Sequence, residues 1–191
     1  MIALGIALCA QLSIAKALPN GLRPTADAWT FARAGAVRGV TIGPIESVRH
    51  PNRGYGSEAF ERALDESVRL GATWISLTPF GRVHDLTPEG IDKSFEAPFA
   101  ENRAAVMRAV GQAHERGLRV LLVPHLWVES GEWRALIDPQ TDQGWERWSR
   151  AYRAFVLEWA DVAHQSGVDM LSVGVELRSW VTRPQAASMV A

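Results

Sequence analysis

VDMLSVGVEL, residues 168–177, is the stretch that decides the fold, because a nearly continuous apolar run ends there in a single carboxylate, that of Glu176. A run of this kind is typical of a strand buried on both faces. Gly167 stands directly before it, where a helical pattern stops, and glycine accepts the left-handed conformation that ends many helices. The sequence therefore predicts a buried strand whose C-terminal end presents a glutamate.

The same junction of helix, glycine and apolar run occurs three times. The glycines are Gly71, Gly117 and Gly167, and the runs that follow them span residues 72–78, 118–124 and 168–175. An earlier apolar run at residues 37–43 predicts a first strand. Helical spacing of apolar residues predicts the intervening helices, over residues 58–70, 101–116 and 145–166. Strands that alternate with helices indicate an α/β fold with a parallel sheet and right-handed crossovers.

Loop lengths favour a closed (β/α)8 TIM barrel over an open doubly wound sheet. The loops after the strands are long and carry His, Asp, Trp and Arg, whereas the turns from helix to strand are short and centred on Gly. In a barrel the active site is built from the loops that follow the strands. No GxGxxG or GxxxxGK[ST] motif follows the first strand, so the main signature of a nucleotide-binding sheet is missing. We therefore expect a barrel that is truncated after about its fourth strand.

The composition argues against several classes of protein. The 191 residues are 47% hydrophobic and 21% charged, as in an ordinary globular domain. A formal net charge of −1 gives no basic field that would attract nucleic acid or anionic membranes. The single cysteine, Cys9, cannot form an intramolecular disulfide, and no Cys/His cluster has metal-ligand spacing. We expect no metal, no organic cofactor and no nucleic-acid partner.

The N-terminal segment, residues 1–18, is apolar but too short to span a bilayer. It resembles the core of a secretory signal, although its first basic residue, Lys16, comes after the apolar run. A secreted or periplasmic protein is the first expectation. The alternatives are a ragged N-terminal helix in a cytoplasmic protein and lipidation at Cys9. Residues 19–191 form the barrel part in either case.

Four segments together resemble the central part of glycoside hydrolase family 113. They are GLRVLLVPH at residues 117–125, GEWR at 131–134, the tryptophan-rich helix from 145 to 160, and GVEL at 174–177. The resemblance extends over residues 37–180, which is most of this chain but only the first half of a barrel. It implies a (β/α)8 enzyme of a clan of retaining β-glycosidases, with β-mannanase as the principal activity of the family.

The resemblance also implies a role for Glu176. In the clan the acid/base glutamate ends the fourth strand, and Glu176 ends the fourth apolar run counted from residue 37. Partial desolvation by aromatic walls would raise the pKa of such a carboxyl, so that it carries a proton near neutral pH. The residues alone leave an alternative, in which Glu176 forms only an ion pair with Arg178. Val175 stands where many members of the clan have an asparagine.

The retaining reaction needs a second carboxylate, which the clan takes from its seventh strand. The tail at residues 182–191 has no pattern of a fifth strand. The remaining acids near the expected barrel mouth follow earlier strands and do not match the nucleophile's position: Glu46, Asp85, Glu129 and Glu132. We expect three possibilities: a fragment of a longer barrel, a half-barrel that self-associates through its open edges, or a non-catalytic carbohydrate-binding remnant. The first is preferred.

Other polar and aromatic residues after the strands are candidate ligands of a sugar. We expect substrate contacts from His125, Trp127, Trp133, Trp180, His84 and Asp85. Structural roles as loop anchors remain the alternative for each of them. Arg82 and Arg134 are expected to clamp loops rather than to act in the chemistry. The predicted function is a retaining glycoside hydrolase on β-linked, mannan-type polysaccharide.

Overall fold

The computed structural model describes residues 37–43, 52–94 and 97–183, so the expected signal segment at 1–18 and Glu46 lie outside it. The described elements follow one another as β1 (Gly39–Ile42), α1 (Glu58–Arg69), β2 (Trp74–Leu77), β3 (Phe80–Val83), α2 (Phe99–Glu115), β4 (Arg119–Leu122), β5 (His125–Val128), η2 (Arg134–Leu136), α3 (Asp142–Ser166), β6 (Met170–Leu171) and α4 (Arg178–Val181).

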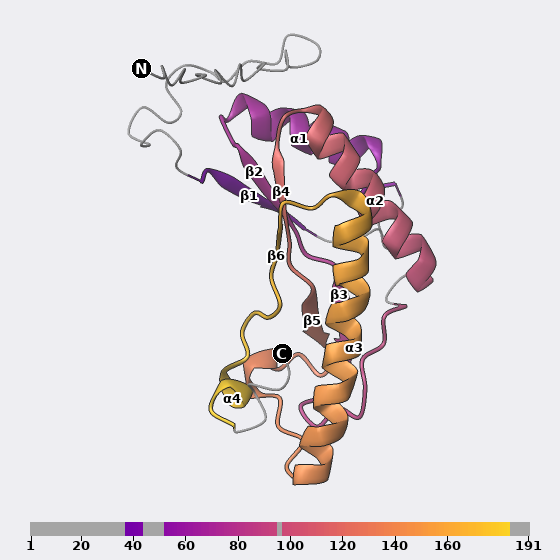
Figure 1. Cartoon of the computed structure of the whole chain (residues 1–191), viewed down its shortest axis with the longest axis vertical. Coiled ribbons are helices and arrows are strands. Elements are labelled where there is room, and N and C mark those ends of the chain that lie inside the picture. Colours follow the sequence, from indigo (N-terminus) through magenta and orange to yellow (C-terminus); the bar gives the residue numbers. More distant parts are fainter. Residues whose placement is uncertain (1–36, 44–51, 95–96, 184–191) are drawn as a thin grey trace, which may run out of the picture.

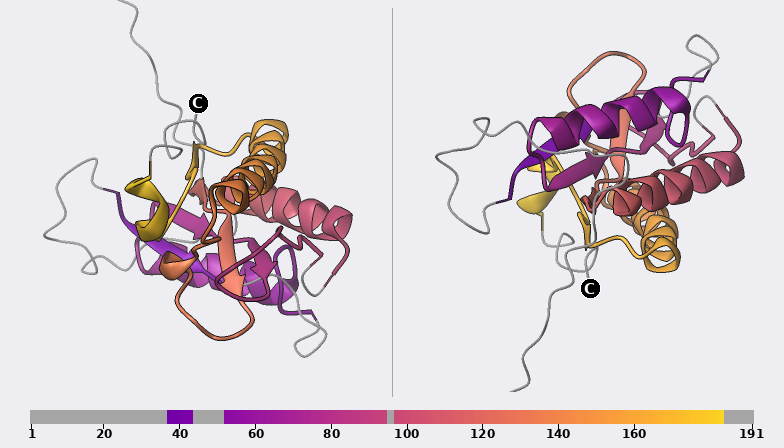
Figure 2. Two further views of the ribbon diagram at one scale, coloured as in Figure 1. Left: turned by 90° about the horizontal axis from the view of Figure 1, so that it is seen from below. Right: turned by 90° about the horizontal axis from the view of Figure 1, so that it is seen from above.

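The main sheet is parallel throughout, with strand order β1-β2-β4-β6. Helices α1, α2 and α3 lie on one side of it, as Figures 1 and 2 show. This arrangement confirms the predicted alternation of strands and helices. No helix in residues 37–43, 52–94 and 97–183 is long and apolar enough to cross a membrane.

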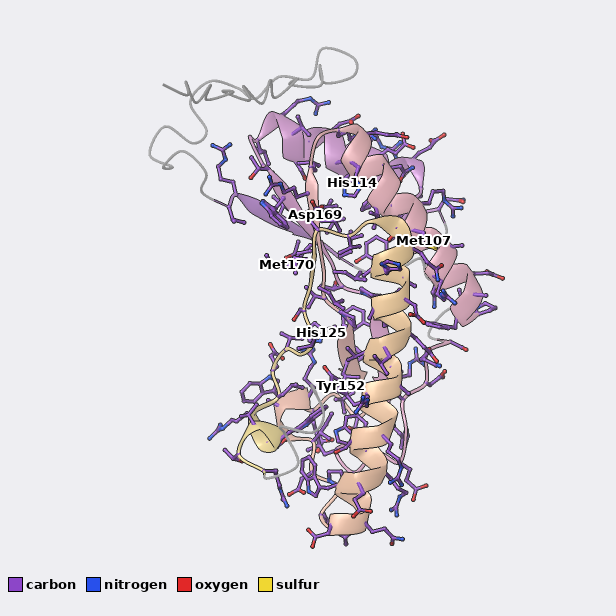
Figure 3. All side chains as sticks on the ribbon, in the orientation of Figure 1. Met107, His114, His125, Tyr152, Asp169 and Met170 are labelled. Atoms are coloured by element: carbon purple, nitrogen blue, oxygen red, sulfur yellow. The ribbon has the colours of Figure 1, made fainter. Side chains whose placement is uncertain are left out.

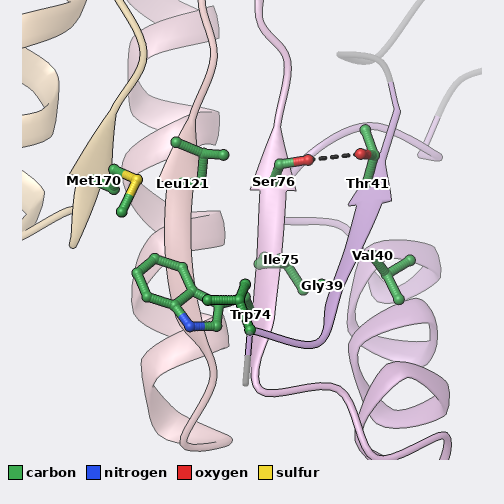
Figure 4. A pocket seen from close by; sticks show the side chains of 9 residues that line it. Gly39, Val40, Thr41, Trp74, Ile75, Ser76, Leu121 and Met170 are labelled. Carbon is green, nitrogen blue, oxygen red and sulfur yellow. Dashed lines mark hydrogen bonds between the residues drawn. The ribbon is translucent and has the colours of Figure 1, made fainter. Parts of the chain in front are cut away.

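The two faces of the main sheet differ in burial. Side chains that point toward the helices are fully buried, among them Ile75, Leu77, Val120 and Leu122. Their neighbours along the strands point to the opposite face and are only half-buried. That open face carries a hollow of about 320 Å³, which is lined by residues of all four strands such as Thr41, Trp74, Leu121 and Met170 (Figure 4). One layer of helices therefore covers one face of the sheet.

The helix ends follow the signals in the sequence. The Ser57 hydroxyl accepts a hydrogen bond from the amide of Phe60 at 3.2 Å and caps α1. Thr141 caps α3 in the same way, so this helix begins at Asp142, three residues before the predicted start. Gly167 closes α3 with a positive φ of 72°, the left-handed conformation that the sequence predicts there.

The second and third barrel strands are longer than predicted. After β2 and β4, the chain continues into β3 and β5, which pair in parallel. Leu122 lies 45 residues after its partner Leu77, and His125 lies 45 residues after its partner Phe80, so the register is unbroken. Pro79 and Pro124 oppose each other between the two pairs and lack the amide hydrogen that a ladder needs. The expectation that loops begin at Pro79 and His125 was wrong, because strand pairing resumes at Phe80 and His125.

The fourth strand is shorter than predicted. The sequence indicates a strand over residues 168–175, whereas β6 comprises only Met170–Leu171. Within the part of the chain that the structure describes, β6 has a partner on one side only, β4. Its ladder ends with the amide of Ser172, which donates to Leu122 at 2.8 Å. The following residues leave the sheet and form the turn that carries Glu176.

Candidate active site

Glu176 lies in the turn between β6 and α4, with a backbone φ of +54°. This left-handed region is costly for a residue with a side chain, and such residues cluster at functional sites. The turn is held from outside, because the Tyr152 hydroxyl of α3 donates a hydrogen bond to the carbonyl of Val173 at 3.1 Å. A side chain at Gly174 would overlap Leu177. The surrounding structure thus fixes the unusual backbone at Glu176.

The Glu176 carboxylate accepts two hydrogen bonds on one oxygen. Trp133 donates its indole N–H to Glu176 Oε2 at 3.0 Å, and Arg134 donates from Nη1 to the same oxygen at 2.6 Å. Both donors come from the loop and the short helix η2 that follow β5. The sequence alternative of an ion pair with Arg178 was wrong in its partner, since Arg134 occupies that place.

The pKa of the Glu176 carboxyl is lower than its ordinary value. Desolvation is the largest single influence and raises this pKa. The hydrogen bond from Trp133, the charge and hydrogen bond of Arg134, and the charge of His125 together outweigh it. Our expectation of a raised pKa was therefore wrong for this arrangement, because it did not include a cation in contact with the carboxylate. Glu176 is ionised at neutral pH.

His125 begins β5 and lies beside the same cation. Its Nε2 is 3.3 Å from Arg134 Nη1, and its Nδ1 faces the amide of Leu126 at 2.9 Å. The Phe80 ring of the neighbouring strand packs against the imidazole, with centroids 5.4 Å apart. Burial and, next, the charge of Arg134 lower the pKa of His125, although Glu176 acts in the opposite direction. The imidazole is therefore neutral at neutral pH.

Two of the three expected aromatic platforms are exposed. Trp127 on β5 is 46% exposed and Trp133 is 49% exposed. Trp127 also packs edge-to-face on Phe80 at 6.0 Å, which anchors it to the strand pair. Each indole therefore presents a free face on the same rim as Glu176.

Trp180 is a correction. We expected its ring to stack on a sugar, but it is only 2% exposed. It packs edge-to-face against Tyr152 at 4.4 Å and against Trp148 at 5.3 Å. A ring enclosed by α3 in this way has no face left for a ligand. Its role is to attach α4, and with it the Glu176 turn, to the core.

His84 and Asp85 follow β3 but do not join the Glu176 cluster. Asp85 accepts hydrogen bonds from the amide and the hydroxyl of Thr87, which lower the pKa of its carboxyl. His84 lines a separate open hollow of about 570 Å³, together with Arg82 and Glu129. Arg82 and Glu129 form an ion pair at 2.6 Å there, as expected for a loop clamp.

Sequence reasoning also underestimated Arg134, which we expected only to clamp a loop. The one feature of the sequence that could have indicated its contact with Glu176 is its position next to Trp133, in the loop after the apolar run at residues 118–124. No group of three or more His, Cys, Asp or Glu side chains in the described ranges is arranged to hold a metal ion.

Comparisons with known proteins agree on one family. The model of Glycoside Hydrolase Family 113 matches residues 48–188. A solved GH113 β-1,4-mannanase complex superposes with a TM-score of 0.67 at 18% identity, covering 81% of this chain and 50% of that one. The GH113 β-mannanase AaManA of Alicyclobacillus acidocaldarius, solved in complex with ManMIm, superposes with a TM-score of 0.66 at 22% identity, covering 75% of this chain and 45% of that one. No curated protein matches the chain.

The chain thus spans about half the length of these solved structures. Its parallel strands and outer helices confirm the prediction of a (β/α)8 barrel, of which the described residues supply the first four strands. The match to the family model covers well over half of the sequence. The chain therefore belongs to glycoside hydrolase family 113.

Proposed function

We propose that this chain carries the acid/base half of a retaining glycoside hydrolase that acts on β-linked, mannan-type polysaccharide. The observation that carries the proposal is the position of Glu176 at the end of the fourth parallel strand, in a chain of this family. Such a residue lies at the C-terminal face of a barrel, where active sites are built. The strained backbone at Glu176 supports a functional role.

In a retaining hydrolase, two carboxyl groups lie about 5 Å apart and flank the glycosidic bond. Glu176 would donate a proton to the leaving oxygen and later remove one from water, while the second carboxylate attacks the anomeric carbon. The described acids on the neighbouring loops have other partners: Glu129 binds Arg82, Asp85 binds Thr87, and Glu132 binds Ser130. We therefore infer that the second carboxylate lies outside the described residues.

The exposed indoles suit a sugar chain. Trp127 and Trp133 offer flat apolar faces for the C–H groups of a pyranose ring, and His125 offers a ring nitrogen close to Glu176. His84 and Asp85 would contact more distant sugar units from the end of β3. The two solved relatives are described as a β-1,4-mannanase and a β-mannanase, which supports mannan as the substrate class.

A non-catalytic, carbohydrate-binding role is the second candidate. The ion pair between Arg134 and Glu176 favours it, because it keeps the carboxyl ionised and unable to act as an acid. Under this alternative the exposed tryptophans bind glycan, and Glu176 has only a structural role beside them.

The experiment that separates the two functions combines hydrolysis with binding. The purified chain would be incubated with mannohexaose beside Glu176→Gln and the matched control Glu132→Gln, and its mass would be fixed by light scattering. Hydrolysis that Glu176→Gln abolishes and Glu132→Gln retains supports the enzyme. Binding without hydrolysis by a monomeric wild-type chain would mean either a fragment that lacks the second carboxylate or a binding protein.

We also propose that the protein is exported through residues 1–18. The support is the apolar run of that segment. Mass spectrometry of the N-terminus after expression tests this, since a mature chain that still begins at Met1 contradicts export by cleavage.

A further inference from the structure

One oxygen of Glu176 is committed to protein donors. Trp133 Nε1 and Arg134 Nη1 both donate to Oε2, at 3.0 and 2.6 Å. The Arg134 side chain is 21% exposed, against 40% for Glu176, so the cation is the more enclosed partner. Enclosure strengthens an ion pair relative to one in open solvent.

Arg134 contacts a second titratable group at the same time. Its Nη1 lies 3.3 Å from His125 Nε2. A guanidinium has donors only and keeps its charge. Because the Leu126 amide donates to Nδ1 at 2.9 Å, the hydrogen of the neutral ring lies on Nε2, and the Arg134 contact is electrostatic rather than a hydrogen bond. A positive charge at this distance disfavours a second proton on the imidazole. Arg134 thus joins the carboxylate and the imidazole through one nitrogen.

The other charged groups near this cluster are engaged elsewhere or face solvent. Glu132 accepts a hydrogen bond from Ser130. Asp138, on the far side of η2, binds Arg183 at 3.4 Å and the Trp145 indole at 3.2 Å. Arg178 on α4 is exposed. In the part of the chain that the structure describes, Arg134 and His125 are thus the titratable or charged groups that face Glu176.

We propose that Arg134 is a positioning residue that couples Glu176 to His125: one guanidinium holds the Glu176 carboxylate through Oε2 and disfavours a proton on either residue. The inference rests on the proposed function for its catalytic consequence. The coupling itself is a property of the resting site. The lowered pKa of both Glu176 and His125 agrees with one shared cation.

A second carboxylate close to Glu176 would oppose the effect of Arg134, because its negative charge disfavours ionisation of Glu176 and competes for the guanidinium. The arrangement described here therefore corresponds to the ionised form of Glu176.

The test follows the titration of both residues by NMR, in the wild type, Arg134→Gln and Arg134→Lys. The signal of Glu176 is assigned by its absence in Glu176→Gln. Arg134→Gln should move the midpoints of Glu176 and of His125 to higher pH together, and Arg134→Lys should restore most of both shifts. Arg82→Gln, which breaks a matched 2.6 Å ion pair with Glu129, should move neither.

Unchanged midpoints in Arg134→Gln would overturn the proposal. A shift of the Glu176 midpoint without a shift of the His125 midpoint would overturn it as well. If Arg134→Gln does not fold, Arg134→Met takes its place as the neutral variant, with the same upward shifts of both midpoints expected and the same outcomes overturning the proposal. The catalytic consequence has its own readout: the alkaline limb of kcat/KM on mannohexaose should move to higher pH in Arg134→Gln. A limb that does not move while the midpoints stay coupled would reject the catalytic consequence and leave the coupling intact.

Discussion

At the scale of the residue, Glu176 combines a strained backbone with a charge held by two donors. Nothing in stability alone requires a glutamate there, since glycine adopts a positive φ without cost. The position thus has the character of a site where function is maintained against local stability.

Replacement of Glu176 by glycine should therefore give a more stable protein than replacement by glutamine. Both changes remove the ion pair, but only glycine relieves the left-handed strain, which costs about 1 kcal/mol for other residues. Urea unfolding measures the difference. At Glu132, outside the left-handed region, the same pair of changes should have the opposite order. A glycine variant at position 176 that is no more stable than the glutamine variant contradicts the strain.

The sequence predicted Glu176 and His125 because both stand directly after apolar runs, and position in a βα unit is a local property. It could not predict Arg134 as their partner. Arg134 and Glu176 lie 42 residues apart, and their contact depends on how the loop after β5 folds back over the rim. Trp180 was misjudged for a related reason, since its burial depends on α3 rather than on its own neighbours.

At the scale of the element, the extended strand pair β3–β5 depends on close approach to α3. An added Cβ at Gly81 would lie 2.5 Å from Ile91 and 2.9 Å from Phe155. The strand carries no side chain at the point where the aromatic ring of α3 packs against it. The position of His125 and Trp127 on β5 follows from this packing, because β3 and β5 are paired.

Gly81→Ala should destabilise the protein by about 1–3 kcal/mol, the usual cost of overpacking a core. Gly111→Ala is the matched control, since a Cβ at this position of α2 meets nothing within 4 Å. It should stabilise the protein by about 0.5–1 kcal/mol through helix propensity. Thermal or urea unfolding of both variants gives the comparison, and equal effects would contradict the packing.

Both tyrosines of the chain join elements through buried hydroxyls. Tyr55 donates to the carbonyl of Ile42 at 2.9 Å and accepts from the amide of Thr78 at 2.7 Å, while Tyr152 holds the Glu176 turn. Burial raises the pKa of each phenol to about 12. These bonds tie the ends of β1 and β2 together and fix the turn after β6 to α3.

Phenolate absorbance should therefore be absent from the folded protein at pH 10 and arise near pH 12, whereas the urea-unfolded chain titrates near pH 10. Because the folded pKa is raised, the stability contributed by both phenols is present below pH 10 and is lost as the pH rises toward 12. The chain contains only these two tyrosines, so the signal is unambiguous. A folded chain that ionises one phenol near pH 10 would contradict the burial of that residue.

Periodicity predicted the helices well, because an amphipathic stripe and its caps are local. The strand ends were predicted poorly. The sequence predicts loops from Pro79 and from His125 onward, but in the structure the strand pairing resumes at Phe80 and His125 in the same register. Only the pairing of the two strands shows this.

At the scale of the molecule, the sheet is covered on one face and open on the other (Figure 3). The open face combines the Thr41–Ser76 hydrogen bond of 2.7 Å with apolar groups such as Trp74 and Met170. In a complete barrel this face packs against the opposing strands. Within residues 37–43, 52–94 and 97–183, β1 and β6 are the edge strands of this sheet, and open edges favour association.

The chain should therefore self-associate through this face, and Met170→Arg should weaken the association. Met170 is 52% exposed on the open face, and Leu157 is 53% exposed on α3, so Leu157→Arg is a control matched in exposure. Light scattering across a concentration series measures the mass. A wild-type chain that stays monomeric, or equal effects of the two variants, would contradict association through the sheet.

The central claim is that Glu176 protonates the leaving group of a glycoside, and leaving-group dependence tests it most directly. The measurement is kcat/KM of the wild type and Glu176→Ala on mannohexaose and on dinitrophenyl β-mannobioside, whose leaving group needs no proton. The account predicts a loss of about 10²–10⁴-fold on mannohexaose and a far smaller loss on the activated substrate. Equal losses on both substrates would contradict it.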